Sequence, residues 1–145
     1  MLTLDQALTV ATSAMREGTK RGFQPLCVAV LDPGAHVLAL LRHEKASIGR
    51  PDIAIAKAAG CLSMGFGGRE LARRAQEMPQ FFTALAGIFP KGIIPLAGGV
   101  LIRNSAHDIV GCVGISGDTS DNDEVCAIAG IEAVNLAPDT GAPRP

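Results

Sequence analysis

Glycines, serines and acids precede an apolar run in residues 114–130, GISGDTSDNDEVCAIAG, and this composition raises the question of a bound ion. A calcium-binding EF-hand loop needs glycine at its sixth position and glutamate at its twelfth. Counted from Asp118, those positions hold Asp123 and Ala129, so the segment does not fit a calcium loop. A phosphate-binding loop needs a lysine after its glycines, whereas the acids of this segment repel an anion.

The same segment is typical of a helix start. Ser120 or Asp121 can accept hydrogen bonds from the first free amides, and acids in the first turn interact favourably with the helix dipole. A functional interpretation stays open beside this one, because glycines after a strand let the backbone approach a ligand closely. The residues of this candidate ligand rim are Gly114, Ser116, Gly117, Asp123 and Glu124.

Lys57 lies in the sequence IAKAAG, on a predicted helix with few other polar residues. A buried lysine is costly unless it is paired, and its pKa shifts readily. Two interpretations are open. Lys57 forms an ion pair with Asp123 or Glu124, or it contacts an anionic ligand and serves as a catalytic base.

A histidine can ligate haem iron, and this sequence has three histidines. His36 and His107 fall in predicted turns, whereas His43 closes a predicted strand beside Arg42. His43 is therefore the strongest candidate of the three for an iron ligand or a general base, with a plain surface role as the alternative. Arg42, alone or with Arg103, can pair with carboxylates or haem propionates.

The cysteines do not form a metal-binding or disulfide pattern. Each lies in an apolar context, and none belongs to a CxxC pair. No two histidines have the spacing of metal ligands. We therefore expect buried, reduced thiols and no metal site, the cysteines being Cys27, Cys61, Cys112 and Cys126.

The composition narrows the classes of function. The 145 residues carry a formal net charge of −1; 48% are hydrophobic and 3% are aromatic. Without clustered Lys and Arg or stacking aromatics, the sequence predicts neither a nucleic-acid partner nor a membrane surface. No apolar run reaches the ~20 residues of a membrane span, and the N-terminus does not resemble a signal peptide. We expect a cytoplasmic protein.

Hydrophobic periodicity and turn signals predict helices that alternate with two hairpins. Thr3 and Gln6 form a capping box that begins the first helix, and Gly18 is expected to end it. The other expected elements are a hairpin of strands 26–31 and 36–41, a helix from Pro51 to about residue 64, a short charged helix or turn at 69–78, a hairpin of strands 99–103 and 109–116, and a helix at 121–135.

These elements predict a single α+β domain in residues 1–137, followed by a flexible C-terminal tail in 138–145. A fifth, short strand is expected near Ile93 and Ile94, in a loop bracketed by prolines. At least one ring of the Phe81-Phe82 pair is expected in the core, with a pocket wall or an oligomer contact as the alternative.

Four segments occur in an order that resembles one known family, namely VAVLDPGAHVLALLRHEKAS, AIAKAAG, LAGGVLI and IVGCVGISGDTSDNDEVCAIAG. From about residue 4 to residue 137, the chain is similar to the GlcG/HbpS-like family, often called haem-degrading domains, which includes the C-terminal domain of PduO-type proteins. The resemblance implies a profilin-like fold, with helices packed on the faces of a five-stranded antiparallel sheet. It also implies assembly into a homo-oligomer.

The resemblance implies a function as well. Some members of the family bind haem and one extracellular branch degrades it, so the leading expectation is a protein that binds haem or a related tetrapyrrole. Arg42, His43, Lys57 and the candidate ligand rim would contribute to that site. One alternative is an enzyme acting on a small carboxylate or an oxygenated ring compound, with Lys57 and His43 as acid and base. The other is an accessory subunit without catalysis.

The sequence departs from the family pattern in two places. Residues 42–46 read RHEKA where the family has Arg-Met-Asp-Gly-Ala, and Leu101 stands where the family motif Gly-Gly-x-Pro-Ile has its proline. Both changes lie near the pocket that the resemblance implies. They can alter which ligand fits or remove haem binding.

Overall fold

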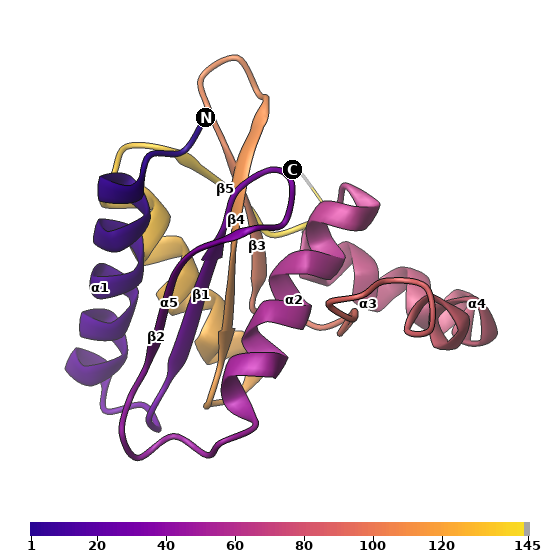
Figure 1. Ribbon diagram of the computed structural model, residues 1–145, viewed down its shortest axis with the longest axis horizontal. Coiled ribbons are helices and arrows are strands. Elements are labelled where there is room, and N and C mark those ends of the chain that lie inside the picture. Colours follow the sequence, from indigo (N-terminus) through magenta and orange to yellow (C-terminus); the bar gives the residue numbers. More distant parts are fainter. Residues whose placement is uncertain (144–145) are drawn as a thin grey trace.

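The computed structural model describes residues 1–143 as an α+β fold built on one sheet (Figure 1). Its helices are α1 (Leu4–Arg21), α2 (Arg50–Met64), α3 (Gly68–Glu77), α4 (Pro79–Leu85) and α5 (Ser120–Glu132), and its strands are β1 (Cys27–Leu31), β2 (Val37–Arg42), β3 (Gly99–Arg103), β4 (Ile109–Ser116) and β5 (Ala137–Asp139). The strand order is β2-β1-β4-β3-β5, and each neighbouring pair is antiparallel. The expected five-stranded antiparallel sheet and both hairpins are confirmed.

The first helix begins as predicted and ends later than predicted. The Thr3 hydroxyl accepts the Gln6 amide, and the Gln6 side chain accepts the Thr3 amide, which is the expected capping box. The predicted end at Gly18 is wrong, because the helix runs to Arg21 and Gly22 caps it with a left-handed φ of 71°. Packing requires glycine at position 18, because a Cβ there would lie 2.6 Å from Cδ1 of Leu26.

The predicted fifth strand near Ile93 is also wrong. Ile93 packs onto α2, where a Cβ on Gly60 would lie 2.6 Å from its Cγ1, and it pairs with no strand. The fifth strand is β5, which pairs with β3 at the edge of the sheet. An edge strand tolerates Pro138, so this residue and Asp139 belong to the sheet and not to a tail. Residues 144–145 of the predicted tail lie outside the described residues.

Helices cover both faces of the sheet (Figure 1), with α1 and α5 on one face and α2 on the other. The side chains of β1 alternate between the two layers. Val28 and Val30 pack with the α1/α5 layer, whereas Cys27, Ala29 and Leu31 pack with the α2 layer. A strand buried on both faces reads as a continuous apolar run, which is why CVAVL carries no polar residue.

Helix α2 approaches the sheet unusually closely because glycines face it. A Cβ on Gly99 of β3 would lie 2.6 Å from Sγ of Cys61. A Cβ on Gly114 of β4 would overlap the carbonyl oxygen of Ala54. These strand glycines therefore set the depth at which α2 lies on the sheet.

Helices α3 and α4 form an arm that projects from the body of the molecule (Figure 1). Of its two adjacent phenylalanines, Phe82 is 6% exposed and Phe81 is 47% exposed, and their rings meet edge to face at 5.8 Å. The expectation that one ring of this pair packs in the core is confirmed.

Replacing Gly114 by alanine should destabilise the protein by about 3 kcal/mol, because the added methyl group overlaps the α2 backbone and forces the helix away from the sheet. Urea unfolding of G114A measures this loss. Gly49→Ala is the matched control, since that position has open space around it and an ordinary φ of −83°. Equal stability of G114A and G49A would contradict the proposed close contact.

Candidate functional site

A buried ion pair closes one end of the sheet. Lys57 of α2 and Asp123 of α5 have side chains 4% and 1% exposed, and Lys57 Nζ lies 3.2 Å from Asp123 Oδ2. Nζ also donates to the Ile115 carbonyl at 2.9 Å, and Asp123 Oδ1 accepts the Asp118 amide at 3.0 Å. Because α2 and α5 cover opposite faces, this pair joins them around the end of β4. The geometry matches the ion-pair interpretation of Lys57, with Asp123 as the partner.

The charge of Lys57 makes the burial of Asp123 tolerable. Desolvation raises the pKa of Asp123 above its ordinary value, and the positive charge of Lys57 acts against that rise. A carboxyl group whose folded-state pKa is raised stabilises the fold most when it is protonated. That contribution is lost as the pH rises from the unfolded value of about 3.9 through the folded value. Lys57 therefore limits the cost of an ionised Asp123 at neutral pH.

The acids of the loop before α5 accept hydrogen bonds from neighbouring protein groups. The predicted N-cap, Ser120 or Asp121, is wrong, because Thr119 is the N-cap and its hydroxyl accepts the Asn122 amide at 3.2 Å. Asp118 accepts the Gln24 amide, the Thr119 amide and the Asn122 side chain, each at 2.7 Å. These hydrogen bonds hold the pKa of Asp118 below its usual value.

Glu124 is engaged with α3. Its carboxylate accepts Arg69 Nε at 2.8 Å and Arg69 Nη2 at 2.9 Å, and the same Nη2 lies 2.9 Å from Asp121. The Glu124 carboxylate is the main cause of a raised pKa for Arg69. The bidentate pair links the N-terminal end of α5 to that of α3.

The glycines of the candidate ligand rim face protein. Gly114 is covered by α2, and a Cβ on Gly117, whose φ is 141°, would overlap the Pro25 carbonyl. Ser116 is fully buried, and its hydroxyl accepts Arg50 Nη1 at 2.9 Å. Of this predicted set, Ser116 contacts Arg50, a guanidinium with no carboxylate within 4 Å in the part of the chain that the structure describes.

Arg42 and His43 are neighbours in sequence that lie on opposite faces of the sheet. Arg42 is paired with Cys27 in the sheet register and so faces the α2 layer. His43 lines a depression beside α1. The proposed acid–base partners Lys57 and His43 are therefore not brought together. Arg103 lies at the other end of the sheet, where it pairs with Asp139 at 2.9 Å.

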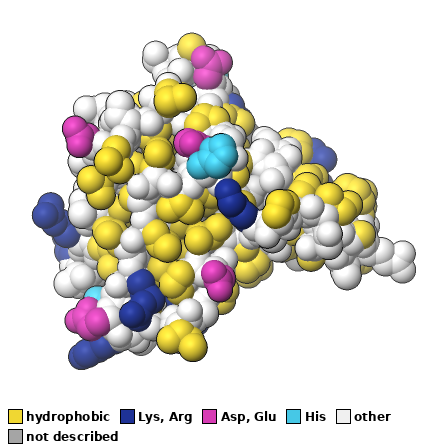
Figure 2. Space-filling model, viewed as in Figure 1, with side chains coloured by type: hydrophobic (Ala, Val, Ile, Leu, Met, Phe, Trp, Pro, Cys, Tyr) yellow, Lys and Arg dark blue, Asp and Glu magenta, His cyan; other side chains and the backbone are white. Residues whose placement is uncertain are grey.

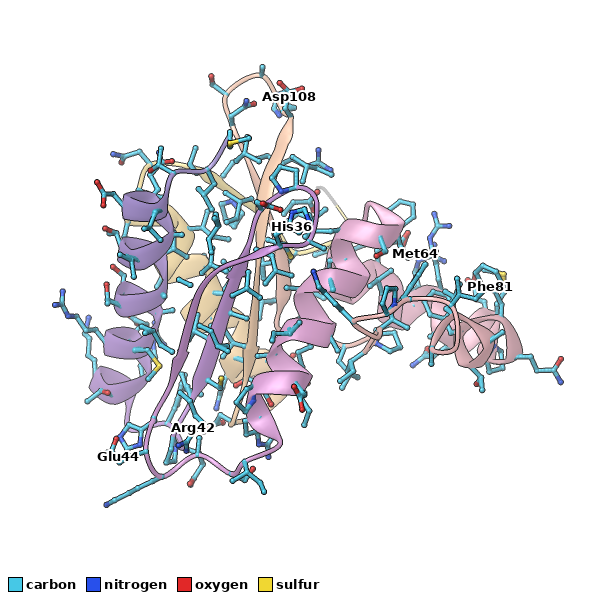
Figure 3. The ribbon with its side chains drawn as sticks, viewed as in Figure 1. His36, Arg42, Glu44, Met64, Phe81 and Asp108 are labelled. Atoms are coloured by element: carbon cyan, nitrogen blue, oxygen red, sulfur yellow. The ribbon has the colours of Figure 1, made fainter. Side chains whose placement is uncertain are left out.

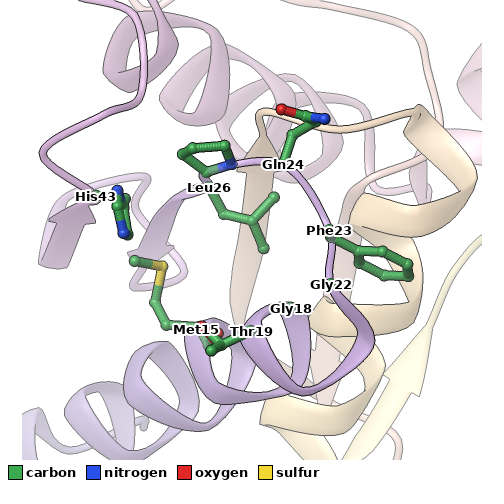
Figure 4. Close-up of a pocket in the computed structure, with 9 residues that line it drawn as sticks. Met15, Gly18, Thr19, Gly22, Phe23, Gln24, Leu26 and His43 are labelled. Atoms are coloured by element: carbon green, nitrogen blue, oxygen red, sulfur yellow. Dashed lines mark hydrogen bonds between the residues drawn. The ribbon is translucent and has the colours of Figure 1, made fainter.

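His43 and Met15 line two adjoining surface depressions between α1 and β2. The first holds about 230 Å³ and is walled by Phe23 and Leu26 (Figure 4). The second is wider and more open, at about 590 Å³, and runs along Leu40. Since both depressions share Met15 and His43, they form one continuous surface, which we call the α1–β2 surface.

The ring of His43 is held by its own loop. Nδ1 accepts the Lys45 amide at 3.0 Å, and the Glu44 carboxylate lies 3.4 Å from the same nitrogen. In the described structure no protein group hydrogen-bonds Nε2. Because Nδ1 accepts the Lys45 amide, the neutral ring carries its proton on Nε2. Ligation through Nε2 would move the proton to Nδ1, where the Glu44 carboxylate would replace the Lys45 amide as its hydrogen-bond partner. His43 thus has one ring nitrogen without a protein partner among the described residues and a carboxylate near the other.

The thiols behave as the sequence predicts. All four cysteines are free and buried, and burial raises the pKa of Cys27 and of Cys126 to about 11. Within residues 1–143, no group of three or more His, Cys, Asp and Glu side chains is placed to hold a metal ion. No helix in the same range is long and apolar enough to cross a membrane.

Two residues were missed by the sequence analysis. Met15 looks like an ordinary core residue of α1, and only its position beside His43 distinguishes it. Arg50 precedes a helix-starting proline and gives no signal of its contact with Ser116, which is 66 residues away in the chain. Neither proximity follows from spacing along the sequence.

Several solved structures share this fold. HbpS is 30% identical, with a TM-score of 0.80 over 92% of this chain and 90% of that one. A double mutant of Streptomyces reticuli HbpS is 31% identical, with a TM-score of 0.80 over 92% and 87%. PduOC, solved as a haem complex, is 21% identical, with a TM-score of 0.83 over 94% and 96%, and shows the fold alone. Among curated proteins, none matches the chain.

By its fold, this chain is a small α+β domain with an antiparallel sheet between helices, as are these relatives. Residues 2–132 match the family model described as haem-degrading protein HbpS-like. The chain belongs to the HbpS-like family. The predicted family is confirmed, and the description of the family names haem.

Removing the charge of Lys57 should destabilise the fold by about 3–5 kcal/mol at neutral pH, because Asp123 would remain ionised, buried and unpaired. The loss in K57M should shrink at acidic pH, where Asp123 becomes protonated and neutral. Urea unfolding at both pH values measures it, and Asp123→Asn added to K57M should recover part of the stability. Lys20→Met, at an exposed lysine of α1, is the control. A pH-independent loss would argue against the ion pair.

Proposed function

We propose that this protein binds haem or a related tetrapyrrole on the α1–β2 surface, with His43 as the iron ligand. The observation that carries the proposal is the free Nε2 of His43 on an apolar surface that Met15 shares. An imidazole and a thioether are both known haem ligands. Membership of the haem-degrading HbpS-like family supports the same choice of ligand.

The side chains of this surface suit an amphiphilic ring. Phe23, Leu26 and Leu40 supply apolar contact, and Arg16 and Arg42 lie along the open depression. Guanidinium groups pair with carboxylates, so these two arginines are placed to bind propionates. Bound haem would supply an iron that accepts the His43 nitrogen. The protein contributes the apolar contact, the oriented imidazole and the positive charges.

A single chain covers only part of such a ligand. Pockets that enclose small molecules hold about 300–1,000 Å³, and the more enclosed of the two depressions holds about 230 Å³. Among the described residues β2 is an edge strand of the sheet, and it carries exposed Val37 and Leu40. Apolar side chains spread over this front face (Figure 2). Exposed apolar edge strands are normally covered, so the proposal includes a homo-oligomer in which a second copy covers β2 and completes the site.

The alternative enzyme function, with Lys57 and His43 as acid and base, has weaker support. Lys57 is 4% exposed and is paired with Asp123, and His43 faces the other layer of the sheet. The proposed function is therefore binding. Haem degradation would be an additional activity, detected as a loss of the haem absorbance in air after a reductant is added.

Haem titration of the purified protein should give a saturable shift of the Soret band at one haem per chain. His43→Ala should weaken binding by at least about tenfold, since metal sites lose affinity of this order even when only an outer partner of a ligand is removed. His36→Ala is the matched control, because its side chain is 75% exposed and lies in the β1–β2 turn. Equal affinity of H43A and H36A, or no saturable shift in the wild type, would contradict the proposal.

Leu40→Glu should disrupt the proposed oligomer, because it places a charge at the centre of the apolar edge strand. Light scattering coupled to size-exclusion chromatography should report a lower mass for L40E than for the wild type. Leu96→Glu is the control, since Leu96 is 46% exposed in the segment before β3. A wild-type monomer, or an unchanged mass for L40E, would contradict a β2 interface.

A further inference from the structure

Two arginines at one end of the sheet have no carboxylate within 4 Å among residues 1–143. Arg42 ends β2, and its Nη1 donates only to backbone carbonyls of the following loop, at 3.2, 3.4 and 3.0 Å. Arg50 begins α2, and the one hydrogen bond that its guanidinium makes to a described residue is to the Ser116 hydroxyl. Most other arginines lie within 4 Å of a carboxylate, namely Arg21, Arg69, Arg73, Arg74 and Arg103.

The sheet register brings these two arginines to one place. Cys27 pairs with Arg42 on one side and with Ser116 on the other, so the three side chains form a row that faces the α2 layer. Strands lie about 4.8 Å apart, so the backbone of Arg42 is about 10 Å from that of Ser116. Arg50 reaches the Ser116 end of this row from α2. Long arginine side chains readily span the remaining gap.

The nearby charges do not neutralise the two arginines. Lys57 and Asp123 balance each other. Asp118 accepts hydrogen bonds from the amides of Gln24 and Thr119. Figure 3 shows Arg42 inside the curve of the loop that leads to α2, with Glu44 toward its outer side, and the Glu44 side chain is 80% exposed. Two guanidinium groups therefore share one end of the sheet without a counter-ion among the described residues.

We propose that Arg42 and Arg50, the latter positioned by Ser116, form a binding site for a small organic anion that carries two carboxylates. Each guanidinium can hold one carboxylate through two parallel hydrogen bonds. The fully buried Ser116 hydroxyl accepts a hydrogen bond from Arg50 and so fixes the position of that guanidinium. This site shares Arg42 with the open depression of the α1–β2 surface, whereas Arg50 and Ser116 belong to this site alone. The tests below therefore change Arg50, which has no part in haem binding through His43.

The probe is succinate, titrated into the full-length protein by isothermal calorimetry at low salt. The uncharged diamide of succinate is the ligand control, because it keeps the shape and lacks the carboxylates. We expect saturable binding of succinate, no binding of the diamide, and at least about tenfold weaker succinate binding in Arg50→Gln. Arg50→Lys should retain part of the affinity, because it keeps the charge without the planar fork.

Arg21→Gln is the matched protein control, since Arg21 lies at the end of α1 and pairs with Glu17. It should bind succinate as the wild type does. Thermal melting with and without succinate distinguishes a role of Arg50 in binding succinate from a role in stabilising the fold alone. If R50Q has a lower melting temperature than the wild type yet succinate raises it by the same amount, Arg50 only stabilises the fold through Ser116 and the proposal is wrong. It is equally wrong if the wild type binds neither compound or binds both alike.

Discussion

The ion pair between Lys57 and Asp123 is the interaction on which the arrangement of this molecule depends. It joins helices from opposite faces at the end of the central strand β4, and backbone hydrogen bonds from Ile115 and Asp118 complete it. A buried charge pair with its remaining hydrogen-bonding positions satisfied fixes one geometry, because every alternative leaves a charge unpaired in a low dielectric. The acidic loop, the start of α5 and the row containing Ser116 all take their positions around it.

A second constraint is the close approach of α2 to the sheet. Glycines at Gly99 and Gly114 leave no room for side chains, so the α2 backbone lies against β3 and β4. This depth lets Lys57 reach the Ile115 carbonyl and lets Arg50 reach Ser116. Residues that resemble ligand-binding glycines in the sequence are thus the means by which the fold places charged side chains at the end of the sheet.

The two faces of the sheet offer different chemistry. On the α1 side, His43 and Met15 lie on an apolar surface suited to a flat, metal-containing ring. On the α2 side, Arg42 and Arg50 present positive charge beside a buried hydroxyl. Strand β2 separates them because successive residues of a strand point to opposite faces. One short segment, residues 42–50, therefore contributes to both surfaces.

The fold class, both hairpins, the capping box at Thr3 and the family could be predicted from the sequence, because they follow from local periodicity, turn chemistry and ordered motifs. The end of α1 was misplaced at Gly18, because a glycine that ends a helix and a glycine that makes room for a neighbouring side chain look alike in sequence. The fifth strand was misplaced at Ile93, because the pairing of β5 with β3 depends on the folded chain. The pairing of Lys57 with Asp123 and not Glu124, and the contact of Arg50 with Ser116, are seen in the folded protein alone. Those pairings join residues more than 60 positions apart, and their distances depend on how the helices pack on the sheet.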